Sequence, residues 1–258
     1  MNRTLWISAT GMECQQLMTD TIANNMANVN TTAYKRSAAQ FQDMLYQNMG
    51  SPGAATADSV APVGAQLGTG SRTGGISKNF SQGGLKNTSS ALDLALEGDG
   101  FFEVTMPDGS TAVTRAGSFH LNAAGQVVTV EGYPVVGFPA IETTATAIDI
   151  SRDGTVSTTV DGKTSSKGQV QLVRFPSPEG LSSLGHNLYA ATEASGTAQR
   201  GNPGTSGFGT VAQYFQESSN VEIVSEMVDM IASQRAYEMN SKGIKTADEM
   251  LRMVANLR

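Results

Sequence analysis

The chain has few of the residues that build metal, redox and disulfide sites. Its 258 residues include one cysteine, Cys14, one tryptophan and two histidines. A single cysteine cannot form an intrachain disulfide, and His120 and His186 belong to no cluster of histidines and cysteines with metal-site spacing. We therefore predict no metal and no cofactor, and we expect Cys14 to be a small buried hydrophobe rather than a reactive thiol.

Long apolar runs and basic clusters are also missing. No stretch approaches the roughly 20 apolar residues of a membrane helix, and the N-terminal residues lack the pattern of a signal peptide. That absence favours the cytosol, unless an export machine reads an uncleaved, unfolded N-terminus. The net charge is −6 and the basic residues are scattered, which argues against nucleic-acid binding.

Candidate catalytic motifs fail on their spacing. Residues 180–185 are one residue too long for a nucleophile elbow, and residues 68–74 miss the dinucleotide-binding spacing by one. Four aspartates directly precede glycine, which is typical of turns rather than of paired catalytic carboxylates: Asp99, Asp108, Asp153 and Asp161. We predict no catalytic and no cofactor-binding residues.

What the chain does have is a heptad pattern near its C-terminus. Five apolar residues recur at intervals of seven, with no proline between them: Ile223, Met230, Tyr237, Ile244 and Leu251. This spacing places them on one stripe of a helix, so that two helices can stay in contact. A helix over Asn220–Arg258 would be about 55 Å long, more than one side of a small core can cover.

The N-terminus carries a matching stripe. Its apolar residues are spaced by seven, four, four and seven: Ile7, Cys14, Met18, Ile22 and Val29. Two amphipathic segments, each too long to be buried alone, favour an antiparallel or crossed pair. We expect the two stripes to carry self-assembly. The alternative is two separate surface helices packed on a central domain.

The composition changes at Gly50. Residues 50–75 are rich in glycine, alanine, serine, threonine and proline, and they have too few large side chains to form a core. This segment is either a flexible linker or an extended arm that becomes ordered only against a neighbouring molecule.

From Ile76 onward the apolar residues alternate with polar ones. Leu92, Leu94 and Leu96 predict a half-buried strand. Turn residues between short apolar segments predict hairpins at 107–109, 122–125, 151–154 and 161–162. Many short strands with closely spaced turns indicate an all-β domain.

The predicted fold is α+β and discontinuous. Residues 1–30 and 221–258 would form a coiled-coil-like helical pair, the inner core. Residues 31–75 and 200–220 would connect it, through Gly/Ala/Ser-rich extended segments that include the long arm, to an all-β outer domain at 76–199.

Four separated motifs resemble the flagellar rod and hook family. Its N-terminal signature is similar to residues 22–36, with Asn24, Asn25, Asn28, Tyr34, Lys35 and Arg36. Its mid-chain motifs are similar to residues 96–104, with Gly98, Gly100, Phe101 and Phe102, and to residues 114–119. Its C-terminal signature is similar to residues 219–221, 234–240 and 248–251, with Arg235 and Tyr237. The length and the insert at 46–70 are most similar to the distal rod branch.

The resemblance implies a structural subunit of the basal-body distal rod, which assembles into a hollow helical drive shaft between motor and hook. The implied partners are identical copies, proximal rod proteins, hook or hook-base proteins, and the ring proteins of the peptidoglycan layer and outer membrane. The flagellar type III apparatus would export the chain to the periplasm without a cleaved signal peptide. A proximal rod or hook-like subunit is the alternative; a secreted binding module or enzyme would need convergent polar groups that the sequence does not offer.

Overall fold

The computed structural model describes residues 3–50, 55–56, 59–60, 64–205 and 207–256, and the chain divides into two compact units. The first unit combines Met1–Ala27, Ser37–Ser77 and Glu222–Arg258. The second combines Asn28–Arg36 and Lys78–Val221. Each unit is therefore built from segments that are far apart in sequence. A long helix near either end and many short strands between them place the fold in the predicted α+β class.

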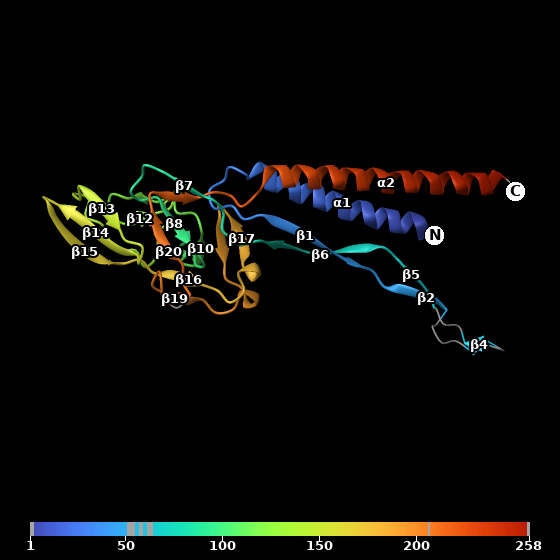
Figure 1. Cartoon of the computed structure of the whole chain (residues 1–258), viewed down its shortest axis with the longest axis horizontal. Helices are drawn as coiled ribbons and strands as arrows, with labels where there is room; N and C mark the ends of the chain where they lie inside the picture. The colour runs from blue at the N-terminus through green and yellow to red at the C-terminus, as the bar shows by residue number, and fades with distance from the viewer. Residues whose placement is uncertain (1–2, 51–54, 57–58, 61–63, 206, 257–258) are drawn as a thin grey trace. The chain divides into compact units, whose positions relative to one another are not determined.

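Two antiparallel helices form the core of the first unit (Figure 1). They are α1 (Arg3–Ala27) and α2 (Ile223–Asn256). Neither contains proline, and Glu226 in the first turn of α2 complements the helix dipole. A turn ends α1, in which the backbone N–H of Thr31 donates to the carbonyl of Asn28. Val29 therefore lies beyond the helix, although the sequence pattern placed it on the helical stripe.

The described parts of residues 50–75, the segment predicted as a linker or neighbour-dependent arm, pair with strands of the same chain; residues 51–54, 57–58 and 61–63 lie outside the described residues. The pairs are β1 (Ser37–Asp43) with β6 (Ser71–Lys78), β2 (Tyr46–Gly50) with β5 (Ala65–Gly68), and β3 (Ala55–Thr56) with β4 (Ser59–Val60). We call β1, β2, β5 and β6 the ribbon. The ribbon also contacts α1, where Oγ of Ser71 donates to Sγ of Cys14 at 3.4 Å. Pairing through the backbone needs no large side chains, which is why the composition did not reveal it.

The second unit is built from short strands in small sheets. The strands are β7 (Leu85–Asn87), β8 (Leu94–Glu97), β9 (Phe102–Thr105), β10 (Thr111–Thr114), β11 (His120–Leu121), β12 (Val127–Val128), β13 (Ala147–Ile150), β14 (Thr155–Val160), β15 (Lys163–Gln169), β16 (Leu172–Arg174), β17 (Ser182–Gly185), β18 (Leu188–Ala190), β19 (Gln199–Gly201), β20 (Thr210–Gln213) and β21 (Phe215–Glu217). Two single-turn 3-10 helices lie at Pro178–Gly180 and Glu193–Ser195. The largest sheet has the antiparallel order β17-β18-β10-β9.

The four predicted hairpins are confirmed. They join β9 to β10, β11 to β12, β13 to β14, and β14 to β15. Local turn chemistry explains the success. In the first hairpin Oδ1 of Asp108 accepts the backbone N–H of Ser110, and Gly109 has a φ of 81°, which favours glycine.

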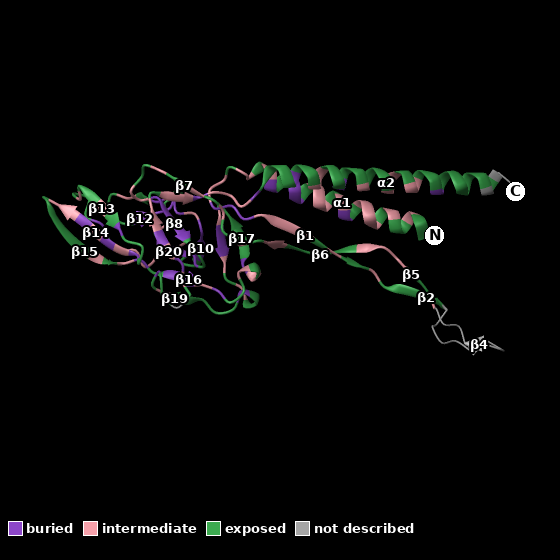
Figure 2. Cartoon of the chain, viewed as in Figure 1, coloured by how far each residue is buried: buried purple, intermediate pink, exposed green. Residues whose placement is uncertain are grey.

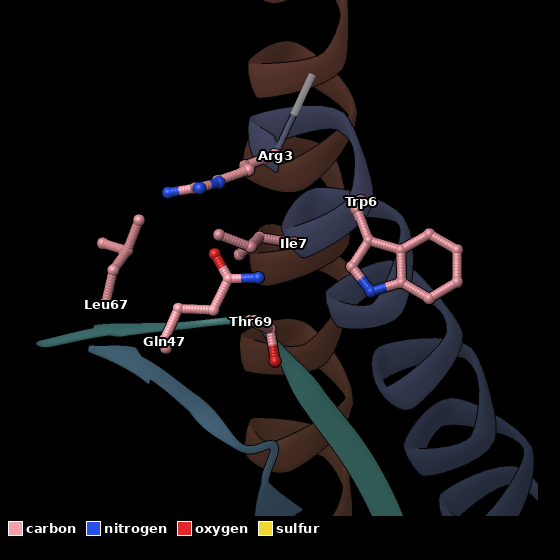
Figure 3. Close-up of a pocket in the computed structure, with 7 residues that line it drawn as sticks. Arg3, Trp6, Ile7, Gln47, Leu67 and Thr69 are labelled. Atoms are coloured by element: carbon pink, nitrogen blue, oxygen red, sulfur yellow. The ribbon is translucent and has the colours of Figure 1, made fainter. Parts of the chain in front are cut away.

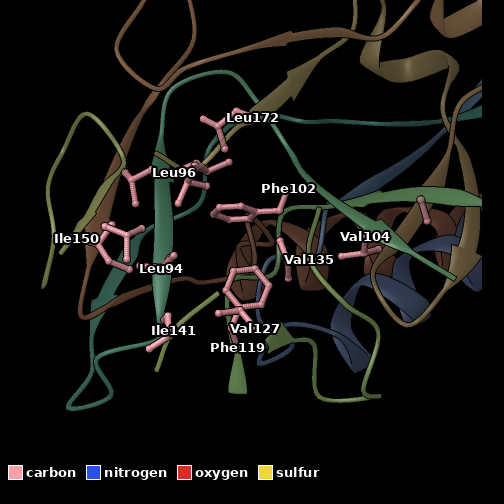
Figure 4. Packing of buried hydrophobic residues seen from close by; sticks show 14 of the residues in the cluster. Leu94, Leu96, Phe102, Val104, Phe119, Val127, Val135, Ile141, Ile150 and Leu172 are labelled. Atoms are coloured by element: carbon pink, nitrogen blue, oxygen red, sulfur yellow. The ribbon is translucent and has the colours of Figure 1, made fainter. Parts of the chain in front are cut away.

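The core of the second unit surrounds β8 and β9 (Figure 4). The rings of Phe102 and Phe119 meet edge to face with centroids 5.0 Å apart. Leu94, Ala95 and Leu96 are all fully buried, so the prediction of a half-buried strand was wrong. Because β8 is covered on both faces, Ala95 occupies a position that the alternation assigned to solvent. Burial is concentrated in this unit, whereas α2 is exposed along most of its length (Figure 2).

Candidate self-assembly surface and motif residues

The contact between α1 and α2 is made by small and polar side chains. Four pairs define its antiparallel register: Ser8 with Gly243, Gly11 with Asn240, Thr19 with Ser233, and Asn25 with Glu226. Oγ1 of Thr19 lies 2.7 Å from Oγ of Ser233, and Nδ2 of Asn25 donates to Oε2 of Glu226 at 3.1 Å. Hydrogen bonds therefore fix this register in addition to apolar packing.

The buried face of α2 is shifted from the predicted stripe. Glu226, Ser233 and Ala247 are at most 1% exposed, and each lies three residues after a member of that stripe. The predicted stripe itself is partly free of α1: its members at 223, 237 and 251 are 49%, 43% and 45% exposed, while those at 230 and 244 are half-buried. The buried residues of α2 thus follow the predicted spacing of seven, but α1 covers the row of Glu226, Ser233 and Ala247 instead of the predicted stripe.

Large apolar side chains cover a different face of α2. The outward stripe, as we call it, consists of residues 49–69% exposed: Ile223, Val224, Met227, Val228 and Ile231. At about 100° per residue, this stripe lies largely opposite Glu226 and Ser233. Of its five members only Ile223 belongs to the stripe predicted from the sequence. Residues 223, 227 and 231 are four apart, and so are residues 224 and 228. This helical spacing is the signal in the sequence that could have identified the outward stripe.

The N-terminal stripe is only partly buried. Cys14 and Ile22 are each 4% exposed, which confirms the expected buried role of the thiol, and Met18 is half-buried. Ile7 is 36% exposed and lies at one end of α1. At that end of α1, Ile7 lines a pocket beside the ribbon.

That pocket is a second apolar surface on the first unit (Figure 3). It has a volume of about 340 Å³ and is lined by α1 and by the ribbon and its connecting residues, including Ile7, Arg3 and Leu67. Trp6, which also lines the pocket, is 52% exposed, and Leu67 is 42% exposed. Apolar side chains therefore remain accessible at both the outward stripe and this pocket.

The N-terminal motif links the end of α1 to β1 and α2. Asn25 is 1% exposed; its side chain accepts the backbone N–H of Ser37 at 2.9 Å and donates to the carbonyl of the same residue at 2.8 Å. Asn24 lies on the exposed side of the helix. Oδ1 of Asn28 accepts from the hydroxyl of Thr31. Asn25 and Asn28 therefore hold the residues that follow the helix.

Lys35 forms a buried ion pair that spans most of the sequence. Its Nζ lies 2.6 Å from Oε1 of Glu217, and both side chains are fully buried. Burial lowers the pKa of Lys35, and the charge of Glu217 opposes that shift. Glu217 was missed by the sequence analysis because its partner is 182 residues away, so no local pattern marks it.

The other motif residues of the second unit have structural contacts. Gly98 and Gly100 have φ values of 106° and 143°, where a β-carbon would be strained. Phe102 belongs to the main core, while Phe101 packs in a second cluster with Tyr189. Beside that cluster, Nζ of Lys78 lies 5.2 Å from the centre of the Tyr189 ring.

Nζ of Lys78 is also 5.5 Å from the ring centre of Tyr34. Arg36 donates its backbone N–H to Oδ1 of Asn220 at 2.7 Å.

In the C-terminal motif, by contrast, Arg235 and Tyr237 are exposed, and the ion pair from Arg235 to Glu238 at 3.7 Å is open to solvent. This part of the motif is accessible to another molecule.

Three family models match separate parts of the chain. "Flagella basal body rod protein" matches residues 5–35, "Flagellar hook protein FlgE/F/G D1 domain" matches residues 95–158, and "Flagellar basal body rod FlgEFG protein C-terminal" matches residues 212–257. They cover the segments that carry the sequence motifs.

Relatives named "Flagellar basal-body rod protein FlgG" match over the full length. The relative in Buchnera aphidicola subsp. Schizaphis graminum is 46% identical over 256 residues, which are 98% of each chain. The relative in Borreliella burgdorferi is 44% identical over 266 residues, 100% of this chain and 99% of its own. The chain belongs to the FlgG family of flagellar basal-body rod proteins.

The assignment holds across distant bacteria. The FlgG protein of Bacillus subtilis is 40% identical over 264 residues, 100% of both chains, whereas "Flagellar hook-basal body complex protein FlhP" of the same organism is 28% identical. The chain is a structural subunit of the distal rod of the flagellar basal body, as its motifs predicted. Over the described residues, neither helix combines the length and hydropathy needed to cross a membrane.

Proposed function

We propose that the subunit polymerises through the outward stripe of α2 into a hollow helical shaft that transmits torque from motor to hook. The observation that supports this proposal is the exposure of five large apolar residues on one face of a helix whose other face is already covered by α1. Monomeric proteins seldom leave such a contiguous apolar surface in water. The occupant of that surface is a second copy of this chain.

The size of the stripe suits a repeated contact. Fully burying a large apolar side chain contributes about 1.5–3 kcal/mol, so covering five half-exposed ones contributes on the order of 5 kcal/mol per contact. A head-to-tail contact that does not close on itself repeats as an open helix. Many such contacts around an axis would form the inner wall of the shaft.

The proposal also covers the arrangement of the subunit in the shaft, its location and its partners. The helix pair takes a coiled-coil-like form in the assembled shaft, the second unit forms its outer layer, and the ribbon bridges neighbouring copies. The shaft lies in the periplasm, reached through type III export of an unfolded chain without a cleaved signal peptide. Its partners there are proximal rod proteins, hook or hook-base proteins and the surrounding rings, and its role is structural rather than enzymatic.

The test compares polymerisation of purified variants at high concentration by sedimentation and electron microscopy. Ile231→Asp places a charge in the outward stripe and is expected to abolish tubes, because that charge would be buried without a partner. Ser225→Asp adds the same charge at an exposed residue of the same helix outside the stripe, and it is the matched control.

Ile244→Asp is expected to abolish tubes as well while the second unit stays folded, because Ile244 is half-buried beside Gly243, which faces Ser8 of α1. Normal tubes from Ile231→Asp, or equal loss in Ser225→Asp, would contradict the proposal. Circular dichroism of each variant checks that the strands remain.

A further inference from the structure

Every crossing of the chain between the two units begins or ends in one of three short segments. The chain passes between the units after residues 27, 36, 77 and 221. On the side of the second unit, these four crossings lie in three segments. They are residues 28–36, the residues that begin at 78, and the residues that end at 221. Three separate segments of this kind would open one by one unless something joined them.

A buried side-chain network joins all three segments. Nζ of Lys35, in the first segment, donates to Oε1 of Glu217 in the third and to the carbonyl of Ser81 in the second, at 2.6 and 2.7 Å. Oε1 of Glu217 also accepts the backbone N–H of Gly83 at 2.9 Å. One ion pair therefore reaches every segment.

Asn220 makes the same three-way connection a few residues nearer to α2. Its Oδ1 accepts the backbone N–H of Arg36 at 2.7 Å, and its Nδ2 donates to the carbonyl of Asn79 at 2.8 Å. Backbone hydrogen bonds run between the same segments, from the N–H groups of Ala33, Asn79, Ser218 and Asn220. We call Lys35, Glu217 and Asn220 the clasp.

We propose that the clasp makes the crossing segments a single mechanical link, so that its three residues are positioning residues for torque transmission. The inference about torque rests on the proposed function, whereas the inference about linkage rests on the contacts alone. Charge-assisted bonds in a site closed to water are the strong kind and resist local opening. Crossing segments without these bonds would instead open independently of one another.

Both charges of the clasp pair can be removed together, and the buried Arg115 beside them keeps Asp99 as an opposite charge. Loss of one partner would leave the other ionised and uncompensated, which destabilises the whole unit. The double variant Lys35→Met/Glu217→Leu replaces both by apolar groups, so it removes the hydrogen bonds while keeping the packing. Asn220→Ala is a second, milder variant, since Asn220 is only partly buried.

The matched control is a different ion pair in the same unit. Arg200 donates to both carboxylate oxygens of Glu103, at 2.8 and 2.6 Å, and joins β19 to β9 rather than any crossing segments. The double variant Glu103→Leu/Arg200→Met removes an ion pair away from the clasp, in which Glu103 is buried and Arg200 is exposed.

The direct test is amide hydrogen exchange in the full-length chain. In the clasp double variant, the amides of Ala33, Asn79, Ser218 and Asn220 are expected to exchange at least tenfold faster, and Asn220→Ala is expected to show the same pattern. Core amides, such as those of Leu94 and Val173, should change less than twofold. The control double variant should leave the crossing amides unchanged.

Unchanged crossing amides in both clasp variants, or equal acceleration of crossing and core amides, would overturn the clasp. Because exchange is measured without polymerisation, this result is independent of whether Ile231→Asp blocks assembly.

The role in torque is tested in cells that carry the clasp double variant. We expect filaments in normal number but a lower swimming speed in viscous medium, where the load on the shaft is high. Normal speed in viscous medium despite accelerated exchange of the crossing amides would overturn the mechanical role.

Discussion

Gly11 of α1 faces Asn240 of α2 so closely that a β-carbon at residue 11 would lie 2.9 Å from Nδ2 of Asn240. A second close approach occurs where Gly243 faces Oγ of Ser8, at 3.3 Å from an added β-carbon. The separation of packed helices depends on the side chains at their contact. These glycines therefore set how near the two helices lie.

Gly11→Leu should weaken the helix pair. Overpacking typically costs about 1–3 kcal/mol, which leucine's better helix propensity, about 1 kcal/mol, only partly offsets. We expect the variant to need a higher protein concentration to form tubes, as measured by sedimentation. Ala9→Leu adds the same side chain at an exposed position of α1 and should not change that concentration. A Gly11→Leu chain that polymerises at the wild-type concentration would show that close approach is not required.

Alkaline pH should weaken the second unit through Tyr189. Burial raises the pKa of this 2% exposed side chain from 10.0 to about 12, and the charges of Tyr34 and Glu217 add to the shift. Between those pH values the unfolded chain loses the phenolic proton and the folded chain keeps it, so stability falls as pH rises. Two pKa units correspond to about 2.7 kcal/mol. Lys35, whose pKa is lowered, acts in the opposite direction, but only below its unfolded value of 10.5.

The alkaline prediction is tested by denaturant unfolding of wild type and Tyr189→Phe between pH 9 and 12. Wild type should lose stability from pH 10 to 12 more steeply than the variant, which lacks the ionisable group. Parallel curves for the two proteins would rule out Tyr189 as the cause.

The features that follow from neighbouring residues could be predicted from the sequence. Turn chemistry fixed the hairpins around Asp108 and Gly109, and seven-residue periodicity identified both helices. The row of α2 that meets α1 could not be predicted, because amphipathic reasoning places apolar residues inward. In this chain, small or polar residues such as Ser233 meet α1 while Ile231 faces outward. That inversion is what a subunit with a partner outside its own chain requires.

Contacts between distant segments were also beyond the sequence. The pair Lys35–Glu217 and the bond from Asn25 to Glu226 each join residues more than a hundred positions apart. The family motifs marked one partner of each pair as important. Only the fold shows which carboxylate each of them meets.

Shortening the segment that joins β2 to β5 should change the shaft rather than the subunit. Gly50 pairs with Ala65, so residues 51–64 can be replaced by Asn-Gly, which favours a two-residue hairpin turn. We expect a folded subunit whose tubes differ from wild type in stiffness or length by electron microscopy. Replacing Asp161-Gly162 by Asn-Gly in the second unit is the control. Identical tubes from the shortened chain would mean that residues 51–64 bridge no neighbours.

The helix pair by itself has little apolar surface buried. Among its described residues, those buried are mostly small or polar, such as Asn25, Thr21 and Ser233, with Ile22 as the one large apolar side chain. Isolated helices are marginal in water without apolar packing. We therefore expect the helices to be stabilised chiefly by contacts between copies.

Far-ultraviolet circular dichroism through the course of polymerisation tests this claim most directly. A dilute monomer is predicted to show the signal of strands with little helix, and the helical signal is predicted to grow in step with the mass of tubes. A dilute monomer that already has the full helical signal, unchanged as tubes form, would contradict it.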